Sequence, residues 1–254
     1  AFEASMVAQF KDNKFEQEFY LFDKTMAESD YKKIYFIPEL ESKLDFVLLQ
    51  FQNPEPAIME EVKKNLVLIQ NEIRRELEDL DQENFEGEEK LVPEKFDSSV
   101  HAQTHRFLDA LKKFYSNRYN AADEKKDNII NNRTTSASGS KEFEEYKEAY
   151  QNEAIAELVK NTAETHRIIE KDGKFVQKIF PIYKDPDPEH IVDFDAQFYM
   201  PSKHFLSTNI DTLIFNLGVI WSMTIVLAIA LYFEILRKIV DGLGNISNPL
   251  PKRM

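Results

Sequence analysis

The chain runs from Thr212 to Phe233 without a charged residue. Leu, Ile, Val and Phe dominate this run, and it lacks the polar stripe that a helix on the surface of a soluble domain shows. About 20 such residues in helical form cross the hydrocarbon core of a bilayer. The pattern therefore predicts one transmembrane helix within residues 211–241. Asp241-Gly242 suits a helix end, and residues 242–254 would form a short tail.

Two long segments upstream carry apolar residues three and four positions apart, as amphipathic helices do. The first stripe consists of Ile58, Val62, Leu66, Ile69, Ile73, Leu77 and Leu80. The second consists of Val100, Thr104, Leu108, Leu111, Tyr115, Ala122 and Ile129. Asn53-Pro54-Glu55 is typical of a helix start, and the second helix is predicted from about Ser99 to Asn131. A dimeric coiled coil would fit the first stripe. Further helices of similar length favour an intramolecular bundle.

The segments around these helices complete the predicted bundle. Residues 134–140 are small and polar and predict a flexible hairpin tip. A third helix is predicted from about Lys141 to Glu170, ending at Asp172-Gly173. Helices joined by short loops pack antiparallel, so residues 38–173 are expected to form an antiparallel helical bundle.

Residues 1–37 are rich in aromatic side chains interrupted by acids and lysines. They predict one or two short amphipathic helices at the membrane surface or against a partner. Pro38 suits a first helical position, with a helix to about Phe51. Residues 174–210 are expected to form an extended return to the membrane, containing one short strand from Lys174 to Phe180.

Near the span, Phe198, Tyr199 and Phe205 are expected at the membrane interface. Lys203 is the only Lys or Arg in the 20 residues before Asp211, whereas four follow Phe233. Basic residues favour the cytoplasmic side. The tail is therefore predicted to be cytoplasmic and residues 1–210 extracytoplasmic. The predicted fold class is all-α: an extracytoplasmic antiparallel helical bundle followed by a single transmembrane helix.

Composition narrows the classes of partner and compartment. The net charge of −13 disfavours nucleic acid. The absence of cysteine excludes disulfides and thiol chemistry, and a Cys-free external domain favours a bacterial protein. The chain opens Ala-Phe-Glu-Ala, without Met or an apolar signal segment. We therefore expect it to be the C-terminal part of a longer protein.

No motif assigns a catalytic or cofactor-binding residue, because P-loop, dinucleotide-binding, serine-hydrolase and zinc-protease patterns are all missing. His101, His105 and Asp109 share one helix face at a spacing that can hold a metal, but a solvated face explains them as well and no metal site is assigned. The cluster Asp185, Asp187, Glu189 and His190 is likewise interpreted as a solvated loop rather than a calcium site.

Four residues of the span are candidates for helix packing or for lining a pathway. Asn216 is its only strongly polar side chain, and Ser222 and Thr224 are the other hydrogen-bonding candidates. Trp221 lies near mid-span, where an interfacial anchor has no role. We expect these residues to contact other membrane helices, as in a domain with several spans.

Two segments resemble ABC-2-type permeases of the White-like G subfamily. Ala1-Phe2-Glu3-Ala4 with Val7-Ala8-Gln9-Phe10 is similar to a stretch on the outer face after the fifth membrane helix, although Ser5 and Gln9-Phe10 depart from the family pattern. The run from Thr212 to Trp221, with Leu231-Tyr232-Phe233, resembles the last membrane helix of fused bacterial ABC transporters. The bundle would then be an enlarged external loop between these helices.

The resemblance implies a bacterial inner-membrane permease that works as a homodimer. Its partners would be the bilayer, other transmembrane helices and a nucleotide-binding domain, which would hold ATP and Mg²⁺ outside this chain. The alternative is a scaffold or adaptor anchored by a single span, with no transport role. An extracytoplasmic sensor is less favoured, because only a short tail would remain for signalling inside.

Overall fold

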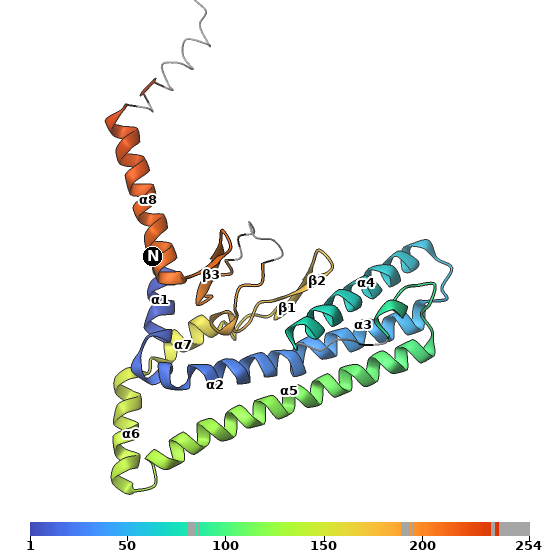
Figure 1. The fold of residues 1–254 in the computed structure, drawn as a ribbon, viewed down its shortest axis with the longest axis horizontal. Coiled ribbons are helices and arrows are strands. Elements are labelled where there is room, and N and C mark those ends of the chain that lie inside the picture. The colour runs from blue at the N-terminus through green and yellow to red at the C-terminus, as the bar shows by residue number, and fades with distance from the viewer. Residues whose placement is uncertain (81–84, 86, 189–193, 195, 235–236, 239–254) are drawn as a thin grey trace, which may run out of the picture.

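The computed structural model describes residues 1–80, 85, 87–188, 194, 196–234 and 237–238 (Figure 1). The α-helices are α1 (Phe2–Lys11), α2 (Lys14–Tyr31), α3 (Ile37–Gln50), α4 (Pro56–Asp79), α5 (Ser98–Arg133), α6 (Ala137–Tyr150), α7 (Glu153–Lys160) and α8 (Thr212–Tyr232). Two antiparallel hairpins pair β1 (Ile168–Lys171) with β2 (Lys174–Gln177) and β3 (Ser202–Phe205) with β4 (Thr208–Asp211). The short helical turns are η1 (Lys32–Phe36), η2 (Glu88–Lys90) and η3 (Pro181–Tyr183).

Helices α2 and α3 form one rod, joined by the π-helical turn η1. Pro38 lies in the first turn of α3. It has no amide hydrogen, and its ring clashes with the carbonyl four residues earlier in an ordinary α-helix. The wider π turn directly before it accommodates the ring. The helix thus crosses position 38, where the sequence suggested a boundary between two units, and the prediction of only short helices before this position is wrong.

Helix α5 lies along this rod in the opposite direction (Figure 1). Five ion pairs link the two, each with its acid on the rod and its base on α5: Glu18–Arg133, Asp23–Lys126, Glu28–Arg118, Glu41–Lys112 and Asp45–His101. The residue numbers rise on the rod as they fall on α5. Partly exposed pairs of this kind contribute about 0–1 kcal/mol each to stability. They therefore define how α5 is aligned along the rod more than they stabilise the fold.

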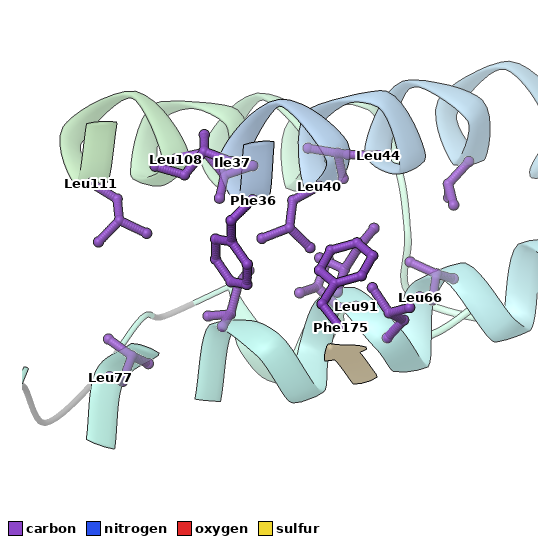
Figure 2. Close-up of a cluster of buried hydrophobic side chains, with 14 of the residues drawn as sticks. Phe36, Ile37, Leu40, Leu44, Leu66, Leu77, Leu91, Leu108, Leu111 and Phe175 are labelled. Carbon is purple, nitrogen blue, oxygen red and sulfur yellow. The ribbon is translucent and has the colours of Figure 1, made fainter. Parts of the chain in front are cut away.

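The main core lies between α3, α4, α5 and β2. Leu40 and Leu44 of α3 are fully buried against Leu66 and Ile69 of α4. Figure 2 shows Phe175 of β2 reaching into the space between α3 and α4, where its ring centroid lies 5.8 Å from that of Phe36. The periodic stripes predicted for α4 and α5 are confirmed: most of their apolar positions enter this core. Ile58 and Leu80 are half-buried against its edge, Ala122 is buried outside it, and Ile129 is half-buried.

A smaller core joins α1, α2, α7 and η3. Val7 and Phe10 of α1 are buried there with Val159 and Tyr183. Phe15 and Phe19 of α2 are buried beside Phe143 of α6. The N-terminal aromatic residues therefore pack largely within this chain, rather than all facing a membrane or a partner as expected.

Helix starts differ slightly from the sequence prediction. Helix α4 begins at Pro56 with Glu55 as its N-cap residue, two positions after the predicted cap. The Asn53 side chain instead accepts a hydrogen bond from the Glu55 amide at 3.0 Å, which closes the preceding turn. Helix α5 begins at Ser98, one residue before the prediction, because the Asp97 carboxylate accepts from the amides of Ser99 and Val100.

The predicted third helix, from about Lys141 to Glu170, is not one continuous helix and does not reach Glu170. Helix α6 ends at Tyr150, and Asn152 caps a separate helix, α7, by accepting from the Ile155 amide at 3.1 Å. Residues 168–177 form the β1–β2 hairpin. Its turn is Asp172-Gly173, with φ of 53° and 73°, a pair that suits the type I′ turn of two-residue hairpins. The expected helix stop is therefore a hairpin turn, and the predicted strand is confirmed over β2.

The described chain is thus mostly helical, with two small hairpins that an all-α class omits. The predicted tip at residues 134–140 is a short turn that runs directly into α6. The expected helix end at Asp241-Gly242 and the tail at residues 242–254 lie outside the described residues.

Candidate functional site at the base of helix α8

Helix α8 is the one helix in the described part of the chain that is long and apolar enough to span a membrane. It has 21 residues and a mean hydropathy of 2.2, and none of its most apolar stretch is buried. It projects away from the bundle (Figure 1) and packs at its base against α1 and the β3–β4 hairpin. The place where this candidate membrane helix meets the rest of the chain is the candidate site.

The start of α8 is fixed by hydrogen bonds from the segment before it. The Asp211 carboxylate caps the helix by accepting from the Leu213 amide at 2.9 Å. The buried Thr212 hydroxyl donates to the Met200 carbonyl at 2.5 Å. Lys11, at the end of α1, binds the other Asp211 oxygen at 2.9 Å.

These contacts determine the charge state of Asp211. Burial acts to raise the pKa of Asp211, but hydrogen bonds from Lys11 and from the Leu213 amide outweigh it and hold the pKa below its ordinary value. The carboxylate is therefore ionised at neutral pH. Its negative charge interacts favourably with the positive, N-terminal end of the α8 dipole.

Glu3 lies at the centre of a buried polar cluster that joins three segments. One carboxylate oxygen accepts from the Lys203 ammonium at 2.5 Å and from the Tyr199 amide at 2.9 Å. The other oxygen accepts from the Asn216 side-chain amide of α8 at 3.3 Å. The side chains of Glu3 and Lys203 are 11% and 3% exposed, and Lys203 also donates to the Gln197 carbonyl. The cluster ties α1 to β3 through a desolvated ion pair, and to α8 through the Asn216 hydrogen bond.

Among the described residues, one of the four candidate span residues hydrogen-bonds to a partner outside α8. Asn216 contacts Glu3, whereas the Ser222 and Thr224 hydroxyls donate to carbonyls of their own helix at 2.7 and 2.9 Å. Trp221 is 66% exposed. Asn216 and Ser222 are six residues apart, about 240° around an α-helix, so the four residues do not form one stripe. Sequence reasoning missed Glu3 and Lys203, because only the fold brings residues 200 positions apart together.

Aromatic rings surround the base of α8. Phe194, Phe205 and Phe215 contact one another, with centroids 5.6–6.4 Å apart. Phe198 and Phe205 are exposed, as interfacial residues would be, but Tyr199 is half-buried and packs against the smaller core. Exposed aromatic side chains beside the first turns of a span suit the headgroup region of a bilayer.

Two buried carboxylates of helix α4 have structural partners. Glu72 accepts from the Phe175 amide at 2.7 Å and from Arg75. Glu76 accepts from the Tyr115 hydroxyl at 2.7 Å and pairs with Lys32. Each is held by a fixed donor, so neither is poised as a free acid or base.

A cavity of about 450 Å³ is lined in part by Glu72, between α2, α4, α5 and η3. Its wall mixes acids and bases, among them the Glu28–Arg118 pair and Lys184. The buried Tyr183 hydroxyl has no hydrogen-bond partner among the described residues, and burial raises the pKa of this phenol. Balanced charge gives the cavity no preference for a ligand of either sign.

His101, His105 and Asp109, which share one face of α5, make two separate sets of contacts. The His101 ring nitrogen pairs with Asp45 of α3 at 2.8 Å. His105 and Asp109 lie together with Glu41 of α3, three groups whose ligand atoms all fall within 4.8 Å of one another.

In the predicted acidic loop, Asp185 pairs with Lys24 and Asp187 with Arg75. These two acids therefore bind basic side chains of the helices. Glu189 and His190 lie outside the described residues.

Comparison of the chain with known protein families, with curated proteins and with solved structures found no match. Its functional interpretation therefore depends on the residues and geometry described above.

Proposed function

We propose that this chain forms the external helical domain and the final membrane helix of an ATP-driven ABC transporter permease of the ABC-2 type. The observation that carries the proposal is the contact between α1 and the base of α8. The two segments that resemble the permease family, Ala1–Phe10 and Thr212–Trp221, lie at opposite ends of the described sequence. They meet through Glu3 and Asn216, and the N-terminus lies beside the base of α8 (Figure 1).

This arrangement is what an external loop between two neighbouring membrane helices requires. Such a loop leaves and re-enters the bilayer at one face, so its two ends must lie close together whatever its length. Here about 200 residues of helices and hairpins separate α1 from α8, yet the Glu3–Lys203 and Lys11–Asp211 pairs hold their bases side by side. The bundle is accordingly an enlarged insertion at the outer face.

In the proposed arrangement, residues 1–210 lie outside a bacterial inner membrane and the tail is cytoplasmic. Helix α8 contributes one wall of the membrane domain of a homodimer. Trp221, two-thirds exposed in this chain, would pack against other membrane helices, which a lone anchor would not need. ATP and Mg²⁺ would be bound by a nucleotide-binding domain outside the chain.

The buried cluster gives this domain a mechanical role. A movement of α8 during the ATP cycle would pull on Glu3 through Asn216 and Lys203, and so move α1 and the smaller core. The external bundle would thereby follow the membrane helix, gating the exit or docking a partner in the cell envelope.

The experiment is ATP hydrolysis by the full-length gene product, purified in detergent. We expect activity that is abolished when the lysine of a P-loop upstream of residue 1 is replaced by Ala. No hydrolysis, with no nucleotide-binding protein co-purifying, would refute the transporter and leave the single-span scaffold as the function.

A further inference from the structure

Helices α3 and α5 bring metal-ligating side chains together on the outer side of the bundle. Glu41 and Asp45 lie four residues apart on α3, and His101, His105 and Asp109 are four apart on α5. Residues four apart on a helix share a face. Because the two helices run antiparallel, Glu41 lies opposite His105 and Asp109, one turn away from the Asp45–His101 pair.

The distances suit a small divalent ion. The His105 Nδ1 and Asp109 Oδ2 atoms are 3.3 Å apart. Bonds of about 2.0–2.2 Å in tetrahedral geometry place zinc ligands roughly 3.3–3.5 Å apart, so this pair needs almost no adjustment. One ligand atom from each of Glu41, His105 and Asp109 lies within 4.8 Å of the other two, and a change of rotamer would complete the set.

The surroundings allow a cation to enter. Glu41 and His105 are half-buried and Asp109 is exposed, which leaves one side open for water as a fourth ligand. Lys112 competes for Glu41: its ammonium is 4.0 Å from the Glu41 carboxylate, and its side chain is 44% exposed. It can turn to solvent at little cost. Two carboxylates neutralise a divalent ion, so binding leaves no uncompensated charge.

We propose that Glu41, His105 and Asp109 form a divalent transition-metal site, with Zn²⁺ the preferred ion, that clamps α3 to α5. The imidazole nitrogen selects zinc-like metals over Mg²⁺ and Ca²⁺, which favour all-oxygen sites. The ligands come from two helices, α3 and α5, so the bound metal restrains the alignment of these helices that the ion pairs define. This site is independent of the transporter proposal.

Its test is isothermal titration of ZnCl₂ into the full-length gene product in detergent, purified without a polyhistidine tag. The variants are His105→Ala and the near-isosteric Asp109→Asn. His166→Ala is the matched control, because His166 is exposed and outside the cluster. We expect His105→Ala and Asp109→Asn to weaken one zinc site by at least about tenfold, with His166→Ala unchanged.

Circular dichroism of each variant checks that its helices are intact. CoCl₂ serves as a second probe, because its visible absorption reports nitrogen and oxygen ligation directly. We expect the Co²⁺ signal of the native protein to be missing in both ligand variants. Zinc binding of unchanged strength in folded His105→Ala and Asp109→Asn would overturn the site, as would equal loss in the His166→Ala control.

Discussion

Glu3→Gln removes one charge from the buried cluster at the base of α8. It leaves the Lys203 ammonium, on a side chain only 3% exposed, without a counter-charge. Removing one partner of a buried ion pair costs about 3–5 kcal/mol. The Gln oxygen still accepts a hydrogen bond from Lys203 or from the Tyr199 amide, so we expect the lower end, about 3 kcal/mol.

The matched control is Asp211→Asn at the other link between α1 and α8. Asp211 and Lys11 are each about one-third exposed, and Asn caps a helix as well as Asp. The cost should therefore be only about 0–1 kcal/mol. The contrast between the two variants separates a desolvated pair from a solvated one in the same interface.

The assay is unfolding of the chain in detergent micelles, followed by circular dichroism, as a double-mutant cycle with Lys203→Met. Lys203→Met in the Glu3→Gln background removes the unpaired ammonium, so the double variant should be more stable than Glu3→Gln alone. The reasoning fails if Glu3→Gln changes the free energy of unfolding by less than about 0.5 kcal/mol, or if Lys203→Met destabilises it further.

Leu40→Ala, at a fully buried site, should cost about 2–5 kcal/mol in the same unfolding assay; Leu49→Ala, at a 79% exposed site, should stay within about 0.5 kcal/mol, and equal effects would contradict the core assignment. Gly173→Ala should cost about 1–2 kcal/mol, because φ of +73° disfavours a Cβ; the added atom meets nothing closer than 3.6 Å, so a neutral result would contradict the turn conformation. The lowered pKa of Asp211 predicts stability that is fully present above the unfolded pKa, about 3.9, and is lost as pH falls through the folded pKa. An unfolding series at decreasing pH should show this loss in the native chain and not in Asp211→Asn, and parallel curves would contradict it.

Long periodic segments were predictable because one physical signal dominates each. The stripes of α4 and α5 match most of the observed core positions, and the uncharged run of α8 forms one helix long and apolar enough to cross a membrane. In contrast, Asp172-Gly173 was misread because a Gly after a helical pattern suits a C-cap, while the same dipeptide suits a hairpin turn. The β-branched and aromatic residues on both sides of it, Ile168, Ile169, Phe175 and Val176, carry the distinguishing signal.

Long-range contacts explain the other errors. The aromatic residues before Pro38 suggested a membrane-surface segment, but Phe10 and Phe19 are covered by helices that begin more than a hundred residues later. Asn216 was identified as a packing residue from its rarity in the span. Its partner Glu3 could not be chosen among the many acids of this chain without the fold.

The most direct test of the account is the location of the bundle and the tail on opposite sides of the membrane. The chain has no cysteine, so Ser138→Cys in α6 and Ser247→Cys in the tail each place a single thiol in it. The full-length gene product, with any other cysteines replaced, is treated in spheroplasts with a membrane-impermeant maleimide. We predict labelling of Ser138→Cys in intact spheroplasts and of Ser247→Cys only after lysis. Labelling of both in intact spheroplasts, or of Ser247→Cys alone, would contradict the account.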